Sequence, residues 1–243
     1  MKGVSTRDPL SPQSQQQWLR FAERRGLFAP VTDSMPSARQ LCYTVLLHEG
    51  LSTLSQVDES IRAGWQQRLG SYQDSVSGQF QFTHAGASTE QQLPDQQDDA
   101  LLDTFLALHA LDALDARAPH SLRFMERFNA SSDLGDWTAA QDTASSRTIL
   151  PFFLIYRAEV EGHREAFGQF HQALDWLEQT QEPTSGLWGP GATRWSAASL
   201  LIAGQILPYF EYVYRPLSRV TRLLDSVLAH RQEDGSLIGA AGD

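Results

Sequence analysis

The spacing of apolar and polar residues along the chain is typical of α-helices and indicates helices of two kinds. Residues 197–214 (AASLLIAGQILPYFEYVY) are apolar on most sides of a helix, which is typical of a helix buried from several directions. Residues 219–230 are amphipathic, with charges between apolar residues at helical spacing: Val220, Leu223, Leu224, Val227 and Leu228. We therefore expect buried inner helices to alternate with amphipathic outer ones.

A glycine followed two residues later by a large apolar residue recurs at near-equal intervals. Successive glycines of this pattern are 52, 57, 51 and 49 residues apart, at Gly26, Gly78, Gly135, Gly186 and Gly235. About fifty residues accommodate two helices of about fifteen residues and their loops. The interval predicts four to five repeats of a helical hairpin.

The residues before these glycines also repeat. Residues 73–78 (QDSVSG) align without gaps on 181–186 (QEPTSG), and 232–235 (QEDG) is a shortened copy. We expect a helix to end before each glutamine and the glycine to adopt a left-handed or cramped backbone conformation. A second repeat, ILPFF at 149–153 and ILPYF at 206–210, predicts helices that kink or restart at proline.

The repeats predict one domain over residues 12–238, between loose termini at 1–11 and 239–243. Residues 83–97 are polar and contain a proline, so we expect an exposed loop there. At 243 residues the chain is long enough to bury a large core.

Charge and composition narrow the functional classes. A composition of 41% hydrophobic and 20% charged residues fits a globular protein, and the net charge of -10 argues against nucleic acid as a partner. The single cysteine, Cys42, offers no internal disulfide and no thiolate cluster for zinc. No apolar run is long enough to span a bilayer and residues 1–17 lack a signal core, so we expect a cytoplasmic protein without a transmembrane segment.

Repeats that end in glutamine, a few turn residues and Gly-x-Trp or Gly-x-Phe resemble those of the terpenoid-cyclase and protein-prenyltransferase group. The best match is 181–188 (QEPTSGLW), supported by 73–80 and 232–237, and the resemblance covers about residues 12–238. It implies an all-α fold, an α/α toroid forming a partial or complete α/α barrel. It also implies an isoprenoid (polyprenyl) substrate in a central apolar cavity lined by aromatic side chains.

The acid motif of the class II cyclases in this group, Asp-x-Asp-Asp-Thr-Ala, has a partial counterpart at residues 139–144 (AAQDTA). This stretch keeps Asp142 but has Gln141 where the proton donor stands in the family. An amide is not a strong acid. This alignment therefore argues against cyclisation initiated by protonation at this position. The resemblance as a whole still implies a cyclase-like lyase or isomerase, with a degenerate acid motif.

A second acidic cluster, Asp95, Asp98, Asp99 and Asp103, begins another predicted inner helix. Asp99 and Asp103 are four residues apart and share a helix face. Crowded carboxylates act as general acids or hold a divalent cation such as Mg²⁺ against a diphosphate, whereas the structural alternative is helix capping. Candidate catalytic residues are Asp98, Asp99 and Asp142, and Mg²⁺ is the only cofactor suggested.

No protein-bound metal is assigned. The prenyltransferase zinc site needs an aspartate spaced by one residue from its cysteine, and Cys42 follows Arg39-Gln40-Leu41 instead. The candidates for substrate binding are two acids, a histidine, three tryptophans for stacking and an arginine at a predicted helix entry. They are Asp95, Asp103, His109, Trp137, Trp188, Arg194 and Trp195.

Three functions stay open. The first, which the resemblance favours, is binding or transformation of an isoprenoid. The second is a carbohydrate-active hydrolase or lyase with Asp98 or Asp99 and Asp142 as acid and base; its stacking platform would be Trp137, Trp188 or Trp195. The third is a non-catalytic binding or assembly module whose open end is covered by a homo-oligomer or a partner protein.

Overall fold

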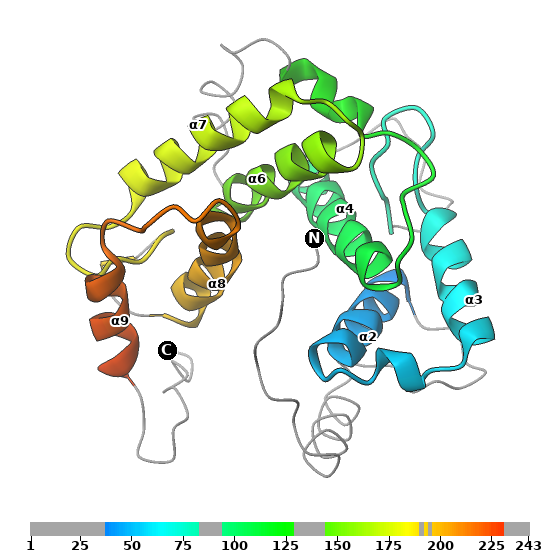
Figure 1. Cartoon of the computed structure of the whole chain (residues 1–243), viewed down its shortest axis with the longest axis horizontal. Helices are drawn as coiled ribbons and strands as arrows, with labels where there is room; N and C mark the ends of the chain where they lie inside the picture. The colour runs from blue at the N-terminus through cyan, green and yellow to red at the C-terminus, as the bar shows by residue number, and fades with distance from the viewer. Residues whose placement is uncertain (1–36, 83–93, 129–143, 190–191, 194–195, 231–243) are drawn as a thin grey trace. The chain divides into compact units, whose positions relative to one another are not determined.

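A computed structural model describes residues 37–82, 94–128, 144–189, 192–193 and 196–230, with only the backbone described at 94–99, 144–147 and 197–198. The chain divides into two compact units, Met1–Phe124 and Met125–Asp243. Each unit is described by itself below. Figure 1 shows the helices that make up both.

The first unit is built from α2 (Ala38–Gly50), η1 (Leu54–Gln56), α3 (Glu59–Gly70) and α4 (Pro94–Ala113). Ser37 begins α2 by accepting a hydrogen bond from the Gln40 backbone N–H, and Asp58 begins α3 in the same way through Ser60. α2 packs along α4, and α3 also contacts α4. Apolar residues at helical spacing on α2 and α4 form the core: Leu41, Cys42, Val45, Ala107 and Ala110 are fully buried.

The second unit contains α6 (Ala144–Glu159), α7 (Glu165–Thr180), α8 (Ala197–Tyr212) and α9 (Val220–Leu228), with η2 (Arg123–Phe128) at the border between the units. α6 packs against both α7 and α8. Pro151 and Pro208 lie inside α6 and α8. Both helices continue past their proline, so of the two predicted outcomes, a kink or a restart, the restart does not occur.

The prediction of an all-α protein is confirmed for the described residues, which form seven α-helices, two 3-10 helices and no strand. Their only β-type pairing is an isolated bridge between Gln73 and Phe80. The helices predicted over 197–214 and 219–230 are observed as α8 and α9. The loop predicted over 83–97 is too long, because α4 already begins at Pro94, where a proline without an N–H is readily accommodated.

Two loops of nearly identical construction follow α3 and α7, and we name them the first Gln–Gly loop (residues 73–80) and the second Gln–Gly loop (residues 181–188). In the first, Gln73 Nε2 donates to the Gly78 carbonyl at 2.8 Å; in the second, Gln181 Nε2 donates to the Gly186 carbonyl at 2.8 Å. Gly78 and Gly186 have φ of +77° and +71°. The left-handed glycine predicted from the repeat is therefore present in both loops.

Each Gln–Gly loop is covered by a segment that follows much later in the same unit. Phe124 N–H donates to the Ser77 carbonyl at 2.8 Å, and the Ser226 hydroxyl donates to the Ser185 carbonyl at 2.8 Å. A Cβ on Gly78 would overlap the Ser121 carbonyl oxygen, and one on Gly186 would lie 2.6 Å from the Leu223 nitrogen. Glycine is thus required at both positions by close approach as well as by conformation.

Candidate functional site

Asp103 is buried at the junction of α2, α4 and the first Gln–Gly loop. Its Oδ1 accepts from Arg39 Nε at 2.6 Å, and its Oδ2 accepts from the Phe82 N–H at 3.1 Å. Only 2% of the Asp103 side chain is exposed. The neighbouring Thr104 hydroxyl accepts from the Phe80 N–H at 2.9 Å. These bonds fasten the end of the loop to α4 and satisfy the Asp103 carboxylate within the protein.

The side chains of the other predicted acids are not described by the structure. Asp95, Asp98 and Asp99 fall in the first two turns of α4, and only their backbone is described. Asp142 lies outside the described residues, as do Trp137, Arg194 and Trp195. The side chains of all three candidate catalytic residues, Asp98, Asp99 and Asp142, thus lie outside what the structure describes, and their roles stay predictions.

His109, a predicted substrate contact, lies on α4. Its ring meets the edge of Phe105 with 4.5 Å between ring centroids. Desolvation lowers the pKa of His109 to about 4, so the imidazole is neutral at physiological pH. A neutral ring of this kind accepts or donates a hydrogen bond but supplies no positive charge to an anion.

Trp188, the predicted stacking residue of the second Gln–Gly loop, lies in the core. Its indole Nε1–H donates to the Leu177 carbonyl of α7 at 2.7 Å, and 2% of the residue is exposed. The ring presents no face to solvent. The indole is therefore used in packing the second Gln–Gly loop against α7.

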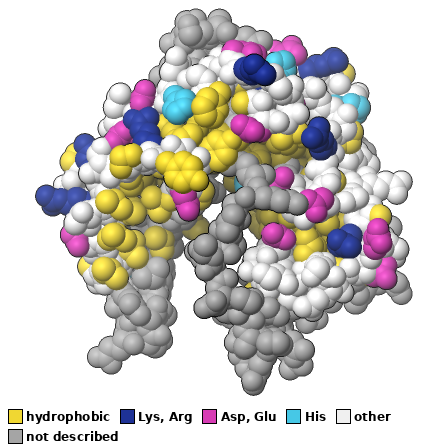
Figure 2. Space-filling view, in the orientation of Figure 1, with side chains coloured by type: hydrophobic (Ala, Val, Ile, Leu, Met, Phe, Trp, Pro, Cys, Tyr) yellow, Lys and Arg dark blue, Asp and Glu magenta, His cyan; other side chains and the backbone are white. Residues whose placement is uncertain are grey.

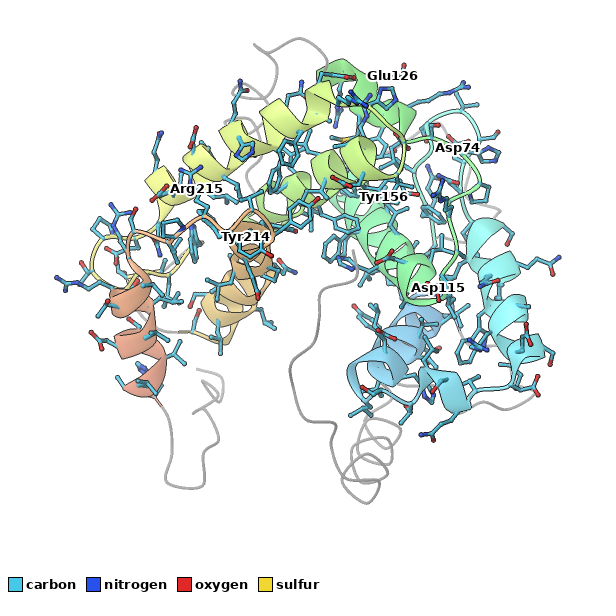
Figure 3. The ribbon with its side chains drawn as sticks, viewed as in Figure 1. Asp74, Asp115, Glu126, Tyr156, Tyr214 and Arg215 are labelled. Carbon is cyan, nitrogen blue, oxygen red and sulfur yellow. The ribbon has the colours of Figure 1, made fainter. Side chains whose placement is uncertain are left out.

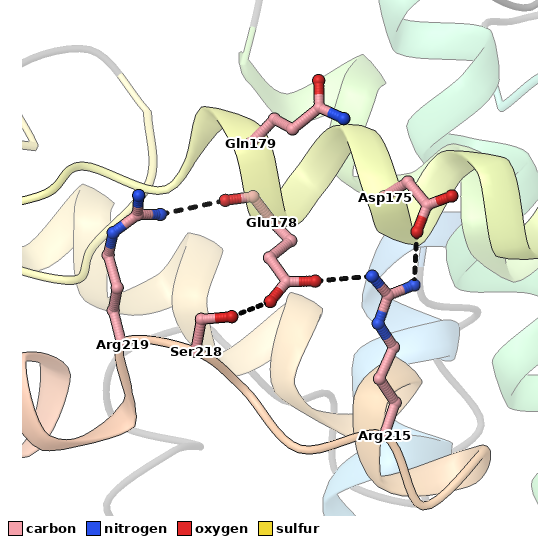
Figure 4. A pocket seen from close by; sticks show the side chains of 6 residues that line it. All are labelled: Asp175, Glu178, Gln179, Arg215, Ser218 and Arg219. Carbon is pink, nitrogen blue, oxygen red and sulfur yellow. Dashed lines mark hydrogen bonds and ion pairs between the residues drawn. The ribbon is translucent and has the colours of Figure 1, made fainter.

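A charged hollow between α7 and the segment after α8 was not predicted from the sequence. It has a volume of about 290 Å³ and is lined by Asp175, Glu178, Gln179, Arg215, Ser218 and Arg219. Arg215, which follows α8, points toward α7 (Figures 3 and 4) and pairs with Asp175 at 2.7 Å and Glu178 at 2.5 Å. We call these residues the Arg215 junction.

The remaining hydrogen bonds of the Arg215 junction are made to Glu178, near the end of α7. The Ser218 hydroxyl donates to the Glu178 carboxylate, and Arg219 Nη1 donates to the Glu178 main-chain carbonyl at 3.1 Å. The Ser218 and Arg215 bonds hold the pKa of Glu178 below its ordinary value. The charges neutralise one another, so the junction ties the 213–219 segment to α7. The Arg-x-x-Ser-Arg pattern at 215–219 was the only sequence signal for it.

The part of the chain that the structure describes meets the requirements of neither a metal cluster nor a membrane-spanning helix. No cluster of three or more His, Cys, Asp or Glu side chains there could hold a metal ion. None of the described helices is long and apolar enough to cross a bilayer. Cys42 is buried. The pKa of its thiol is raised to about 12, mainly by desolvation and to a smaller extent by the negative charge of Asp103.

The most exposed apolar residues on a described helix lie on α8 and α9. On α9, Val220, Leu224 and Leu228 follow one another at intervals of four, and they are 44%, 52% and 57% exposed. We call these three residues the α9 stripe. Hydrophobic side chains gather over α8 and α9 on the left of Figure 2.

The neighbouring side of α9 is used within the unit. Leu223 is 4% exposed and lies against Gly186, and Ser226 bonds the second Gln–Gly loop as described above. α9 therefore has two adjacent apolar faces, of which one docks on the loop and the other meets solvent. A sequence pattern shows that both are apolar but not which one is covered.

The repeat register identifies what the α9 stripe corresponds to in α7. Counting back 4, 8 and 12 residues from Gln232 gives the α9 stripe, and the same count from Gln181 gives Leu177, Ala173 and Gln169. Those α7 residues are 1%, 3% and 7% exposed, and α7 packs along α6. The same register positions are thus covered on one helix and uncovered on the other.

Comparison with known proteins gives no relative for this chain: no family model, curated protein or solved structure matches it.

Proposed function

We propose that this protein is a non-catalytic helical-repeat module that assembles with another polypeptide through the apolar faces of α8 and α9. The observation that carries the proposal is the α9 stripe, which is uncovered although its counterpart on α7 is buried. A contiguous row of exposed large apolar side chains on a folded protein is typical of an interaction site. The acid and tryptophan whose side chains are described, Asp103 and Trp188, are used in folding contacts.

The wider arrangement that we propose for the repeats is an α/α toroid, closed or open. It is supported by the pairing of alternate helices along the chain, α2 with α4 and α6 with α8. The two Gln–Gly loops support it further, since each follows an amphipathic helix, precedes an apolar one and contains the same glutamine-to-glycine hydrogen bond. In such an array a terminal helix pair exposes an apolar face unless something covers it.

The assembly proposal is tested by the native size of the chain in an extract of the cells that produce it. We expect the wild-type chain to elute well above its 27.1 kDa monomer mass, and Leu224→Glu to elute as the monomer. Val76→Glu is the matched control, because Val76 is 74% exposed and lies in the first unit. A wild-type chain that elutes as a monomer contradicts the proposal.

Isoprenoid binding is the second candidate, with any cyclase-like reaction depending on it. It is supported by the two Gln–Gly loops, whose sequences carry the family resemblance, and by the start of α4 at Pro94. That start puts Asp95, Asp98 and Asp99 near the positive end of the helix dipole, where carboxylates are stabilised as anions. Such carboxylates would hold Mg²⁺ against a diphosphate.

A thermal-shift assay with farnesyl diphosphate, with and without Mg²⁺, tests this candidate. A bound ligand raises the melting temperature in proportion to its affinity and concentration. We expect a Mg²⁺-dependent rise that Asp99→Asn abolishes and that Asp112→Asn, an exposed change on the same helix, preserves. An unchanged melting temperature for the wild-type chain contradicts isoprenoid binding.

A further inference from the structure

α9 is attached to the rest of the second unit at few points. Leu223 is the only residue of α9 that is buried, and it lies against Gly186. The Ser226 hydroxyl donates to the Ser185 carbonyl at 2.8 Å. α9 forms no extensive pair with another of the described helices, whereas α7 packs along α6. One side chain and one hydrogen bond therefore dock α9 on the second Gln–Gly loop.

α9 is too short to be stable by itself. It has nine residues, Val220–Leu228, and an isolated helix of fewer than about twelve residues is marginal in water. The β-branched residues Val220, Thr221 and Val227 lower its helix propensity further. Its N-cap residue, Arg219, makes no side-chain capping bond. The stability of α9 therefore depends on contacts outside the helix.

The Arg215 junction supplies the third attachment, and its residues belong to different parts of the unit. The Arg215 N–H donates to the Phe210 carbonyl at 2.9 Å, so the Arg215 main chain is fixed to the end of α8, and its guanidinium holds the Glu178 carboxylate (Figure 4). Ser218 and Arg219 lie next to α9, and they donate to the carboxylate and the main-chain carbonyl of Glu178. Arg215 thus orients Glu178, and Ser218 and Arg219 hold α9 to it.

The chain has a point of flexion between these two groups, at residues 216–217. Pro216 is exposed and has no main-chain N–H to donate. The main-chain bond that crosses this point, from the Val220 N–H to the Leu217 carbonyl, is 3.4 Å long, which is beyond the usual range of an N–H···O bond. A few irregular residues at the end of a helix are the usual hinge of a moving element.

We propose that residues 218–228 form a detachable arm, which leaves the second Gln–Gly loop as one piece while α6, α7 and α8 stay folded. The hinge is at 216–217, and Glu178 is the residue that holds the arm closed. Elements with few buried contacts open locally at a lower free energy than the whole domain. The inference does not depend on the assembly function, because the arm moves within a single chain.

Release of the arm changes the surface of the second unit in two places. On the arm it uncovers Leu223 beside Leu224 of the α9 stripe, so that the two faces of α9 become one apolar surface. On the loop it removes the cover of Gly186 and of the Ser185 carbonyl. The closed arm thus keeps part of its own apolar surface and part of the loop away from solvent.

Hydrogen exchange of the purified chain, followed by NMR at single amides, tests the arm. We expect Ser218→Ala to speed the exchange of all α9 amides about tenfold, because it removes a hydrogen bond to a carboxylate. Exchange in α7 and α8 should be unchanged, since both stay folded when the arm is open. Asp175→Asn is the matched control and should leave α9 unchanged, because it removes an ion pair of Arg215 but neither bond of the arm.

Ser226→Ala separates release of the arm from fraying of α9 in place. Alanine is a better helix former than serine, so a helix that only frays should exchange more slowly in this variant. Release predicts the opposite, an exchange about fivefold faster at every α9 amide, because the bond to the Ser185 carbonyl is lost. Thr221→Ala is an exposed change in α9 that removes no docking bond, and it should not speed exchange.

The double variant Ser218→Ala/Ser226→Ala should show the product of the two single effects, because both bonds break in the same opening. Slower exchange in Ser226→Ala, or an acceleration confined to the end of α9 nearest each substitution, overturns the inference, since α9 would then fray without leaving the loop. Equal acceleration in α6, α7 and α8 also overturns it, because the whole unit would then open together.

Discussion

The first and second Gln–Gly loops have the same backbone but are held by different numbers of side-chain bonds. In the first, Gln73 donates to Gly78 and to the His120 carbonyl, and its Oε1 accepts from the His120 N–H at 2.8 Å. In the second, Gln181 makes only the bond to Gly186, and its buried Oε1 has no hydrogen-bond partner among the described residues. The bond from glutamine to glycine is thus sufficient to define the loop.

The two loops also differ in how their last residue is held. Main-chain N–H groups at Phe80 and Phe82 bond Thr104 and Asp103 of the following helix, α4. Trp188 instead bonds backward, through its indole, to the preceding helix α7. The shared part of the repeat is therefore the turn itself, and the packing around it is particular to each unit.

The largest effect is expected from adding a methyl group to the loop glycines. Gly78→Ala should lower the free energy of unfolding by about 4 kcal/mol and Gly186→Ala by about 3 kcal/mol, because a left-handed alanine is strained and its Cβ meets backbone atoms. Urea denaturation measures both. Gly168→Ala in α7, where the Cβ meets nothing within 4 Å, should be neutral or stabilising. Retained stability in Gly78→Ala would contradict the shared turn.

Replacing the loop glutamines should lower the free energy of unfolding by less than the glycine substitutions do, but the two loops should differ more. Gln73→Met leaves the Gly78 carbonyl and both His120 main-chain groups without their bonds, and should cost about 3 kcal/mol. Gln181→Met loses one bond and also removes an unsatisfied buried oxygen, so it should cost about 1 kcal/mol or less. Urea midpoints of the two variants test this difference, and equal losses would show that the His120 bonds contribute nothing.

The smallest effect concerns pH. The Asp74 carboxylate accepts bonds from Ser77 and the Glu182 carboxylate from Ser185, which lowers the pKa of Asp74 from 3.8 and of Glu182 from 4.5. A lowered pKa stabilises the fold above the unfolded value, and this contribution is lost as pH falls through the folded pKa. The second loop should therefore begin to weaken near pH 4.5 and the first near pH 3.8.

Both carboxylates are near the surface, so the change of stability with pH is small. Urea midpoints measured between about pH 3 and pH 6 should become less dependent on pH in Glu182→Gln, starting at the higher pH, and in Asp74→Asn at the lower. An unchanged pH profile in both variants would mean that the side-chain caps do not matter.

The features that could be predicted from the sequence are those set by residues close together in the chain. The left-handed glycines, the helices at 197–212 and 220–228, and the start of an acidic helix near Asp95 all follow from short patterns. Loop conformation and helix periodicity depend on neighbours within a few positions, so one sequence is enough.

Long-range pairing could not be predicted, and it decides the site. Asp103 belongs to an acidic cluster of the kind expected at a catalytic site, but Arg39, 64 residues earlier in the chain, neutralises the charge of its carboxylate. Likewise the α9 sequence is apolar on two faces, and the Arg215 junction to residues about forty positions earlier determines which one is exposed. No local pattern encodes either pairing.

The hydrogen bonds that close each Gln–Gly loop lie wholly within one compact unit, since Phe124 bonds Ser77 and Ser226 bonds Ser185. Each unit therefore contains one Gln–Gly loop together with the segment that covers it. We expect the two units to fold and unfold as separate steps, so the amide protons of one loop can exchange with solvent while the other loop stays folded.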